Sequence, residues 1–181
     1  MSKKNFLRVT YGSTVHGKEE IDAVKKVLAT STQMGKNVSS FENKISSLFD
    51  KKYGVMTNSG SSALYLAVEA LGLPKNSEVI TPALTFATTV ACLVKNNLIP
   101  VFVDVEKDTF CIDHKAIEKK ITKKTKAILA PDLLGNICEW KEIRRIANKY
   151  KLLLLHDSAD TLGAKLNKKN TGYYTDLSIT S

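Results

Sequence analysis

The sequence predicts an α/β fold in which helices cover both faces of a largely parallel β-sheet. Short apolar runs alternate with helical segments along most of the 181 residues, as in chains built from repeated β-α units. The run Leu152–Leu155 is apolar at every position, which is typical of a parallel strand buried on both faces. The composition, 43% hydrophobic and 25% charged, is that of a globular protein. We therefore expect a single three-layer α/β domain over residues 1–181.

Six segments have the apolar spacing of amphipathic helices. In the first, Ile21, Val24 and Leu28 fall on one helical stripe, and in the fifth Asp113 stands where an N-cap is expected. The expected helices are residues 18–30, 38–49, 61–71, 85–97, 113–121 and 139–151. Each of the last four lies between two apolar runs, as crossover helices between parallel strands do.

Five apolar runs are expected to be strands. They are residues 54–59, 78–82, 99–105, 126–131 and 152–157. In open α/β sheets the functional groups gather at the carboxyl ends of the strands. The residues that follow these runs are therefore the first candidates for a functional site.

The net charge of +9 permits an anionic partner. The lysines occur as scattered pairs, several of them beside acidic residues, so solvated helix surfaces explain them better than a nucleic-acid interface does. A nucleic-acid-binding module is the weaker alternative, because it rests on charge alone and no binding motif is present. A modest positive field also suits a small anionic substrate such as a diphosphate.

The cysteines and the hydropathy indicate a protein of the cytoplasm. Cys92, Cys111 and Cys138 are odd in number, far apart in sequence and form no CxxC pair, so we expect neither a disulfide framework nor a metal site. No run reaches the ~18 apolar residues of a membrane span. Residues 1–14 lack the apolar centre of a signal peptide.

The segment Thr57–Leu64, TNSGSSAL, follows one expected strand and begins a helix. Gly60 permits a tight turn, and the hydroxyls of Ser61 and Ser62 lie beside the first free N–H groups of that helix. Such an arrangement binds an anion such as phosphate. An ordinary serine-rich helix cap has the same pattern.

Two further segments carry candidate cofactor contacts. Phe86 begins a helix after a strand end, where an aromatic ring can stack on a flat heteroaromatic cofactor or simply belong to the core. The run Leu152–Leu155 ends at His156 and Asp157, and a carboxylate at the tip of a buried strand is costly unless it is paired. A protonated pyridine nitrogen is such a partner. Asp160 can face the same cavity, and His156 has no explanation in the sequence.

These segments together resemble the DegT/DnrJ/EryC1/StrS group of nucleotide-sugar aminotransferases and their dehydratase relatives, which use pyridoxal 5′-phosphate (PLP). The similar blocks, in register from about Gly12 to Ser181, are NSGSSAL, EVITPALTFATT, IPVFVDVEKDTFCID, TKAILAPDLLGN, HDSADTLGA and TGYYTDLSITS. The resemblance implies the large domain of fold-type I PLP-dependent transferases, incomplete here. It also implies PLP or pyridoxamine 5′-phosphate (PMP) as the cofactor.

The resemblance implies contacts to the cofactor phosphate from two segments that lie far apart in the sequence. Ser61 and Ser62, beside Gly60, match the family's phosphate-binding pair. Ser181 matches a further serine at the phosphate. Phe86 matches the aromatic residue that stacks on the pyridine ring.

The resemblance also implies which acids act on the ring. Asp157 matches the acid on the pyridine nitrogen and is the expected catalytic residue of this chain. Asp160 stands where aminotransferases usually have Gln, near the ring oxygen. The family's Schiff-base lysine follows the serine matched by Ser181, so its expected position lies beyond the chain. We interpret the chain as an N-terminal fragment that is inactive by itself.

Within the family, the residues after the last long strand favour the dehydratase branch. Aminotransferases typically read EDAAQAHGA where this chain reads HDSADTLGA. The 3-dehydratases of CDP-linked 4-keto-6-deoxyhexoses typically carry the Asp and the Leu-Gly pair seen at Asp160, Leu162 and Gly163. In that branch a histidine replaces the Schiff-base lysine, and the sugar loses its 3-hydroxyl. Ser and Ala, not cysteine, follow the strand-end acid, which implies an enzyme without an iron–sulfur cluster.

The resemblance thus predicts an enzyme of deoxy- or amino-sugar and surface-polysaccharide biosynthesis. Its expected partners are a nucleotide-diphosphate sugar, an amino-acid amino donor and, for the complete enzyme, a second copy in a homodimer. The alternatives are a PLP-dependent nucleotide-sugar aminotransferase and, more remotely, a non-catalytic regulator with the same fold.

Overall fold

A computed structural model describes residues 7, 10 and 12–181, which belong to two compact units. The first unit, Met1–Asn37, contains helix α1 (Lys18–Thr30), which has the predicted bounds. The helix begins where the Glu20 carboxylate accepts a hydrogen bond from the backbone N–H of Gly17 at 2.7 Å. Such a bond satisfies one of the free N–H groups at a helix start.

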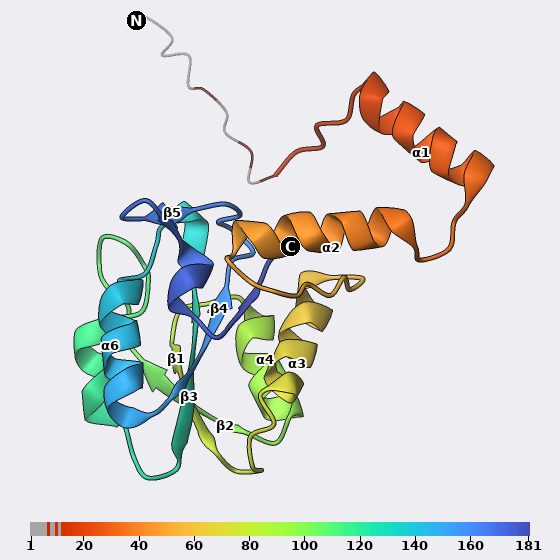
Figure 1. Cartoon of the computed structure of the whole chain (residues 1–181). Helices are drawn as coiled ribbons and strands as arrows, with labels where there is room; N and C mark the ends of the chain where they lie inside the picture. Colours follow the sequence, from red (N-terminus) through yellow and green to blue (C-terminus); the bar gives the residue numbers. More distant parts are fainter. Residues whose placement is uncertain (1–6, 8–9, 11) are drawn as a thin grey trace, which may run out of the picture. The chain divides into compact units, whose positions relative to one another are not determined.

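The second unit, Val38–Ser181, contains a five-stranded sheet whose neighbouring strands are all parallel. Figure 1 shows it below helix α2 (Lys36–Leu48), which begins at the boundary between the units. Its strands, in spatial order, are β2 (Ile99–Val103), β1 (Glu78–Pro82), β3 (Thr125–Pro131), β4 (Leu153–Asp157) and β7 (Leu177–Ile179). The predicted α/β class with a parallel sheet is confirmed.

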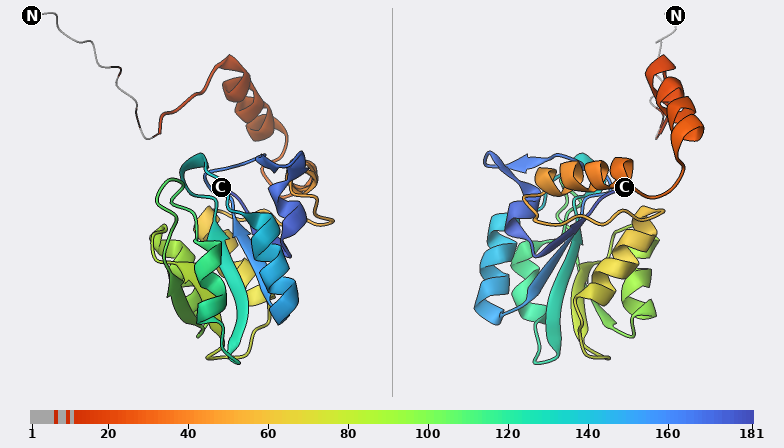
Figure 2. Two further views of the ribbon diagram at one scale, coloured as in Figure 1. Left: turned by 90° about the vertical axis from the view of Figure 1, so that its left-hand side faces the viewer. Right: turned by 45° about the vertical axis from the view of Figure 1, so that its right-hand side comes forward.

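Helices cover both faces of this sheet, as the right-hand view of Figure 2 shows. On one face lie α3 (Gly60–Ala70) and α4 (Ala87–Lys95). On the other lie the short α5 (His114–Ile117) and the longer α6 (Trp140–Tyr150). Within the described part of the chain, no helix combines the length and the apolar character needed to cross a bilayer.

Two cores result, one on each face of the sheet. Leu154 packs with Ile143 of α6, whereas the next residue, Leu155, packs with Leu64 of α3. Because successive side chains of a strand point to opposite faces, a strand between two helical layers must be apolar at every position. Each fully buried aliphatic side chain contributes about 1.5–3 kcal/mol to stability.

Residues 54–59 were expected to form a strand, and that prediction is wrong. The segment is irregular up to the start of α3. Its backbone is hydrogen-bonded to a side chain and not to a neighbouring strand: the N–H of Met56 donates to Glu42 Oε1 at 2.8 Å. Gly54 packs so closely on α2 that a Cβ there would lie 2.6 Å from the Glu42 carbonyl oxygen. Contacts with α2 thus hold a segment whose composition resembles a strand.

The other differences are at short or polar elements. The expected helix 113–121 is divided into α5 and a 3-10 turn, η1 (Glu118–Lys120). Beyond β4 the chain forms a hairpin of two short antiparallel strands, β5 (Lys165–Leu166) and β6 (Lys169–Asn170). The 3-10 turn η3 (Thr171–Tyr174) and β7 follow it. These elements lie in a stretch without an apolar run long enough to predict them.

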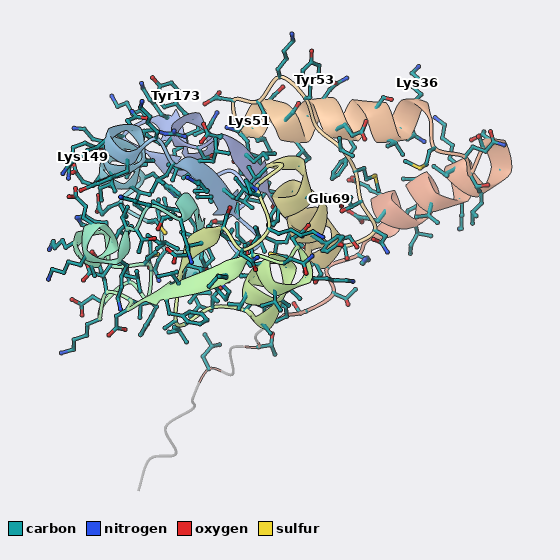
Figure 3. All side chains as sticks on the ribbon, turned by 90° about the horizontal axis from the view of Figure 1, so that it is seen from below. Lys36, Lys51, Tyr53, Glu69, Lys149 and Tyr173 are labelled. Atoms are coloured by element: carbon teal, nitrogen blue, oxygen red, sulfur yellow. The ribbon has the colours of Figure 1, made fainter. Side chains whose placement is uncertain are left out.

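The segment before β7 is tied to the end of α2. Lys51, labelled in Figure 3, donates hydrogen bonds from Nζ to the carbonyl oxygens of Gly172, at 2.8 Å, and of Thr175. The backbone of Phe49 lies directly against Gly172. This contact fixes the path of the chain into β7 and so the position of the residues that follow it.

Candidate functional site

The carboxyl ends of the parallel strands meet at one edge of the sheet, and the candidate residues follow them. Asp157 ends β4 and pairs in register with Ile179 of β7. Beyond the pair, the N–H of Ser158 donates to the Ile179 carbonyl at 2.8 Å, and the Thr180 hydroxyl donates to the Ser158 carbonyl at 3.1 Å. Ser181, the next residue, therefore lies at the same edge as Asp157.

The N-terminus of α3 forms the second part of the site. Ser59 caps the helix, because its Oγ accepts from the N–H of Ser62 at 3.1 Å. Gly60 lies so close to Ser181 that a Cβ on it would come within 2.8 Å of the Ser181 Cβ. Figure 1 shows the chain end beside the start of α3. Glycine is therefore required here, and the last residue of the chain lies against the N-terminus of α3, where helix N–H groups can bind an anion.

Thr89 joins the predicted aromatic residue to the predicted acid. Phe86 is the N-cap of α4, and its carbonyl accepts from the N–H of Thr89 at 3.0 Å. The Thr89 hydroxyl donates to Asp157 Oδ2 at 3.0 Å. The Phe86 side chain is 66% exposed, so it is not the core residue of the alternative interpretation. One buried threonine thus places the start of α4 and the end of β4 next to each other.

Asp157 is a carboxylate held in the interior at the end of β4. It is 4% exposed, and burial raises its pKa above the ordinary range of an aspartate. Hydrogen bonds from the Ala159 N–H, at 3.2 Å, and from Thr89 act in the opposite direction. No ion pair to Asp157 is found among residues 12–181. A protonated pyridine nitrogen would pair with such a carboxylate, so Asp157 fits a pyridine cofactor.

We expect Asp157→Asn to stabilise the cofactor-free protein by roughly 1 kcal/mol near neutral pH. The raised pKa means that the folded state disfavours the ionised carboxylate, so the free energy of unfolding of the unsubstituted protein falls as the pH rises through that pKa. The asparagine amide retains both hydrogen bonds, since the Thr89 hydroxyl can accept as well as donate. Urea unfolding over a pH series measures the difference, which should vanish below about pH 3.8. An equal difference at every pH would exclude ionisation as its cause.

Asp160 contacts a different loop from the other candidates. It is exposed, and its Oδ2 accepts from the N–H of Leu134 at 3.0 Å. Leu134 has a left-handed backbone conformation, φ 55°, in the turn after β3. The carboxylate therefore contacts the loop after β3, at the same edge of the sheet as Asp157.

A cavity of about 570 Å³ lies between α3 and α4. Of the seven predicted residues, Ser61 and Ser62 line it, together with Tyr65, Thr88 and Lys95. Gly60, Phe86, Asp157, Asp160 and Ser181 are not among its lining residues. We place the candidate site at the sheet edge, because the buried acid and the contact between Gly60 and Ser181 are there.

The sequence offered no explanation for His156, and the structure provides one. The side chain is fully buried, and its Nε2 lies 2.8 Å from Oδ2 of Asp132. The other oxygen of Asp132 accepts from the Trp140 indole, at 2.9 Å, and from the N–H of Cys138, at 2.8 Å. Asp132, Thr89 and Ser59 were not predicted, since their roles depend on contacts between segments far apart in the sequence.

Two of the three cysteines lie close together although they are 27 positions apart in the sequence. Cys111 and Cys138 are buried free thiols, and their sulfur atoms lie within 4.8 Å of each other and of a carboxylate oxygen of Asp132. Both oxygens of that carboxylate already accept hydrogen bonds. The group therefore serves as part of the polar core behind β3 and β4.

Comparisons with known proteins show the family to which the chain is similar. A model of the DegT/DnrJ/EryC1/StrS aminotransferase family matches residues 14–181. The lipopolysaccharide biosynthesis protein RfbH of Salmonella typhimurium is 42% identical over 149 residues, which are 78% of this chain and 34% of that protein. The 3-oxo-glucose-6-phosphate:glutamate aminotransferase of Bacillus subtilis is 34% identical over 88% of this chain and 37% of its own length.

A solved structure has the same fold. GDP-4-keto-6-deoxy-D-mannose-3-dehydratase of Escherichia coli, with bound hydrated PLP, superposes with a TM-score of 0.82 at 35% identity. The match covers 87% of this chain and 42% of that one. The chain thus spans less than half the length of these relatives.

Proposed function

This chain belongs to the DegT/DnrJ/EryC1/StrS aminotransferase family, and on that basis we propose that it forms the PLP- or PMP-binding part of an enzyme of nucleotide-sugar biosynthesis. The observation that carries the proposal is Asp157, a buried carboxylate that shares its hydrogen-bond partner Thr89 with the backbone of the exposed residue Phe86. We place the enzyme in the cytoplasm, as a homodimer in which residues 1–181 belong to the large domain.

Different residues of the chain contact the phosphate and the ring of the cofactor. The helix N–H groups at Gly60, the hydroxyls of Ser61 and Ser62, and Ser181 bind the phosphate. The ring of Phe86 stacks on the pyridine. When bound, the cofactor supplies an electron sink for breaking bonds next to the attached carbon.

Asp157 determines how strong that sink is. Its carboxylate keeps a proton on the pyridine nitrogen, and the protonated ring withdraws electrons more strongly. The Thr89 hydroxyl and the Ala159 N–H hold the carboxylate in one orientation and favour its charged form. Burial excludes water, which strengthens the attraction between the two opposite charges.

We propose dehydration at carbon 3 of a nucleotide-linked 4-keto-6-deoxyhexose as the reaction. Asp160 with Leu162 and Gly163 supports it, and so does the similarity to a 3-dehydratase with bound PLP. Such an enzyme takes its amino group from an amino-acid donor. The second candidate is amino transfer to a nucleotide sugar; the 34% identity to a 3-oxo-glucose-6-phosphate:glutamate aminotransferase supports the amino transfer from glutamate.

Product analysis distinguishes the two reactions. A full-length polypeptide that includes this chain is incubated with PLP, glutamate and a nucleotide-linked 4-keto-6-deoxyhexose, and the products are identified by mass spectrometry. A 3-deoxy sugar, with no lysine adduct trapped by borohydride, is the expected result. A stable 4-amino sugar together with a trapped lysine adduct would replace dehydration by amino transfer. Tight cofactor binding without turnover of any such sugar would favour a regulator.

A further inference from the structure

Asp132 and His156 form a buried polar pair directly behind the candidate site. His156 is 0% exposed and Asp132 is 1% exposed. Both carboxylate oxygens of Asp132 accept hydrogen bonds. Oδ1 accepts from the N–H of Cys138 and from the Trp140 indole N–H, and Oδ2 accepts from the His156 ring. The imidazole is packed edge-on against the Trp140 indole, with ring centroids 4.8 Å apart. Because polar groups this deeply buried are costly when unpaired, each member depends on the other.

The pair is connected by the backbone to both acids of the site. The N–H of Asp132 donates to the carbonyl of Asp157 at 3.0 Å. Asp132 is therefore hydrogen-bonded both to the His156 side chain and to the backbone of Asp157, the next residue of β4. Two positions after Asp132, the N–H of Leu134 donates to the carboxylate of Asp160 at 3.0 Å. A movement of residues 132–134 relative to β4 would therefore move both carboxylates.

We propose that Asp132 and His156 are a positioning pair, which sets the orientation of the Asp157 and Asp160 carboxylates towards the cofactor. The inference rests on the proposed function, since it concerns the same site. The pair does not touch the cofactor. Its effect is transmitted through the end of β4 and the loop after β3.

The residue at position 156 must donate a hydrogen bond, because it faces the Asp132 carboxylate. A glutamate in place of His156 would direct a carboxylate at the Asp132 carboxylate. Two buried carboxylates at hydrogen-bond distance repel each other unless one takes up a proton. The substitution His156→Glu should therefore disturb the site.

The partner residue also determines how the disturbance can be reversed. With Asp132→Asn, the amide oxygen can still accept from Trp140 and Cys138, while the amide N–H group occupies the place of Oδ2. That N–H can donate to a carboxylate at position 156. The double variant His156→Glu/Asp132→Asn should therefore restore a paired core in which donor and acceptor have exchanged places.

The experiment uses a full-length polypeptide that includes this chain, loaded with PMP that carries ¹⁵N in its ring. Cofactor affinity and the ¹⁵N resonance, which reports the protonation of the pyridine nitrogen, are measured beside thermal unfolding. His156→Glu should weaken PMP binding on the order of tenfold or more, as expected for one buried hydrogen bond lost, and shift the resonance towards the unprotonated form. The double variant should recover both values to within about threefold of the unsubstituted protein.

Two controls make the outcome decisive. Glu118→Gln alters an exposed contact with Lys149 and should change neither value. If His156→Glu does not fold, His156→Gln, which keeps a donor, is compared with His156→Met, which has none. An unshifted resonance in His156→Glu, a double variant no better than the single one, or equal behaviour of the Gln and Met variants would overturn the proposal. Failure of the unsubstituted protein to bind PMP would instead contradict the proposed function.

Discussion

Asp157→Asn should lower the turnover rate of the full-length enzyme by a factor on the order of 100 to 1,000, while the protein remains folded. A neutral amide cannot hold the proton on the pyridine nitrogen as a carboxylate does, and the loss of one preorganised electrostatic partner has effects of this size. Steady-state kinetics with the nucleotide sugar measure the rate. The value of kcat should fall more than KM changes, because the cofactor and not the sugar is affected.

A matched substitution shows that the effect is local. Asp108 is an exposed aspartate in the turn between β2 and α5, and strands β1 and β3 separate β2 from β4, so Asp108→Asn removes the same charge at another part of the sheet. Its kinetics should equal those of the unsubstituted enzyme. Unimpaired turnover by Asp157→Asn would remove this residue from the proposed role.

Gly172→Ala should destabilise the protein by about 3 kcal/mol, one of the largest effects available from a single methyl group. A Cβ at this position would overlap the carbonyl oxygen of Phe49 and lie 2.8 Å from its carbonyl carbon and 2.7 Å from its Cβ. The backbone must move to relieve the contact, which displaces η3 and the entry into β7. For a chain of this length, a midpoint of thermal unfolding lower by on the order of 10 °C is expected.

Gly12→Ala provides the comparison, because nothing lies within 4 Å of a Cβ added there. It should leave the unfolding midpoint nearly unchanged. Equal midpoints for the two variants would show that the contact between Gly172 and Phe49 does not constrain the fold. Because Ser181 follows β7, Gly172→Ala should also weaken phosphate binding more than Gly12→Ala does.

The fold was predictable where hydrophobic patterns are long. The runs at Glu78–Pro82 and Leu153–Asp157 are continuous because helices cover both faces of those strands, and the structure has both strands there. The wrong strand at residues 54–59 has the same local composition, but its hydrogen-bond partner, Glu42, lies in another helix. β7 was missed because three residues, Leu-Ser-Ile, carry no detectable period. Pairing with β4, a tertiary contact, makes it a strand.

Site residues were predictable only where the residue type and its place in a strand–turn–helix unit together indicated a role. Gly60 and Asp157 stand at such places, and the resemblance to a family added Ser181. Thr89 and Asp132 could not be found in this way, since a buried threonine or aspartate in the sequence does not reveal its partner. The contact of His156 with Asp132 joins the ends of two neighbouring strands, a relation that only the fold establishes.

A crystal structure of the full-length polypeptide grown with PMP tests the central claim most directly. The account predicts the phosphate at the start of α3, between Gly60 and Ser181, and the ring against Phe86. It predicts the pyridine nitrogen within hydrogen-bond distance of the Asp157 carboxylate. PMP with its phosphate away from Gly60 and Ser181, or with its ring nitrogen directed away from Asp157, would contradict it.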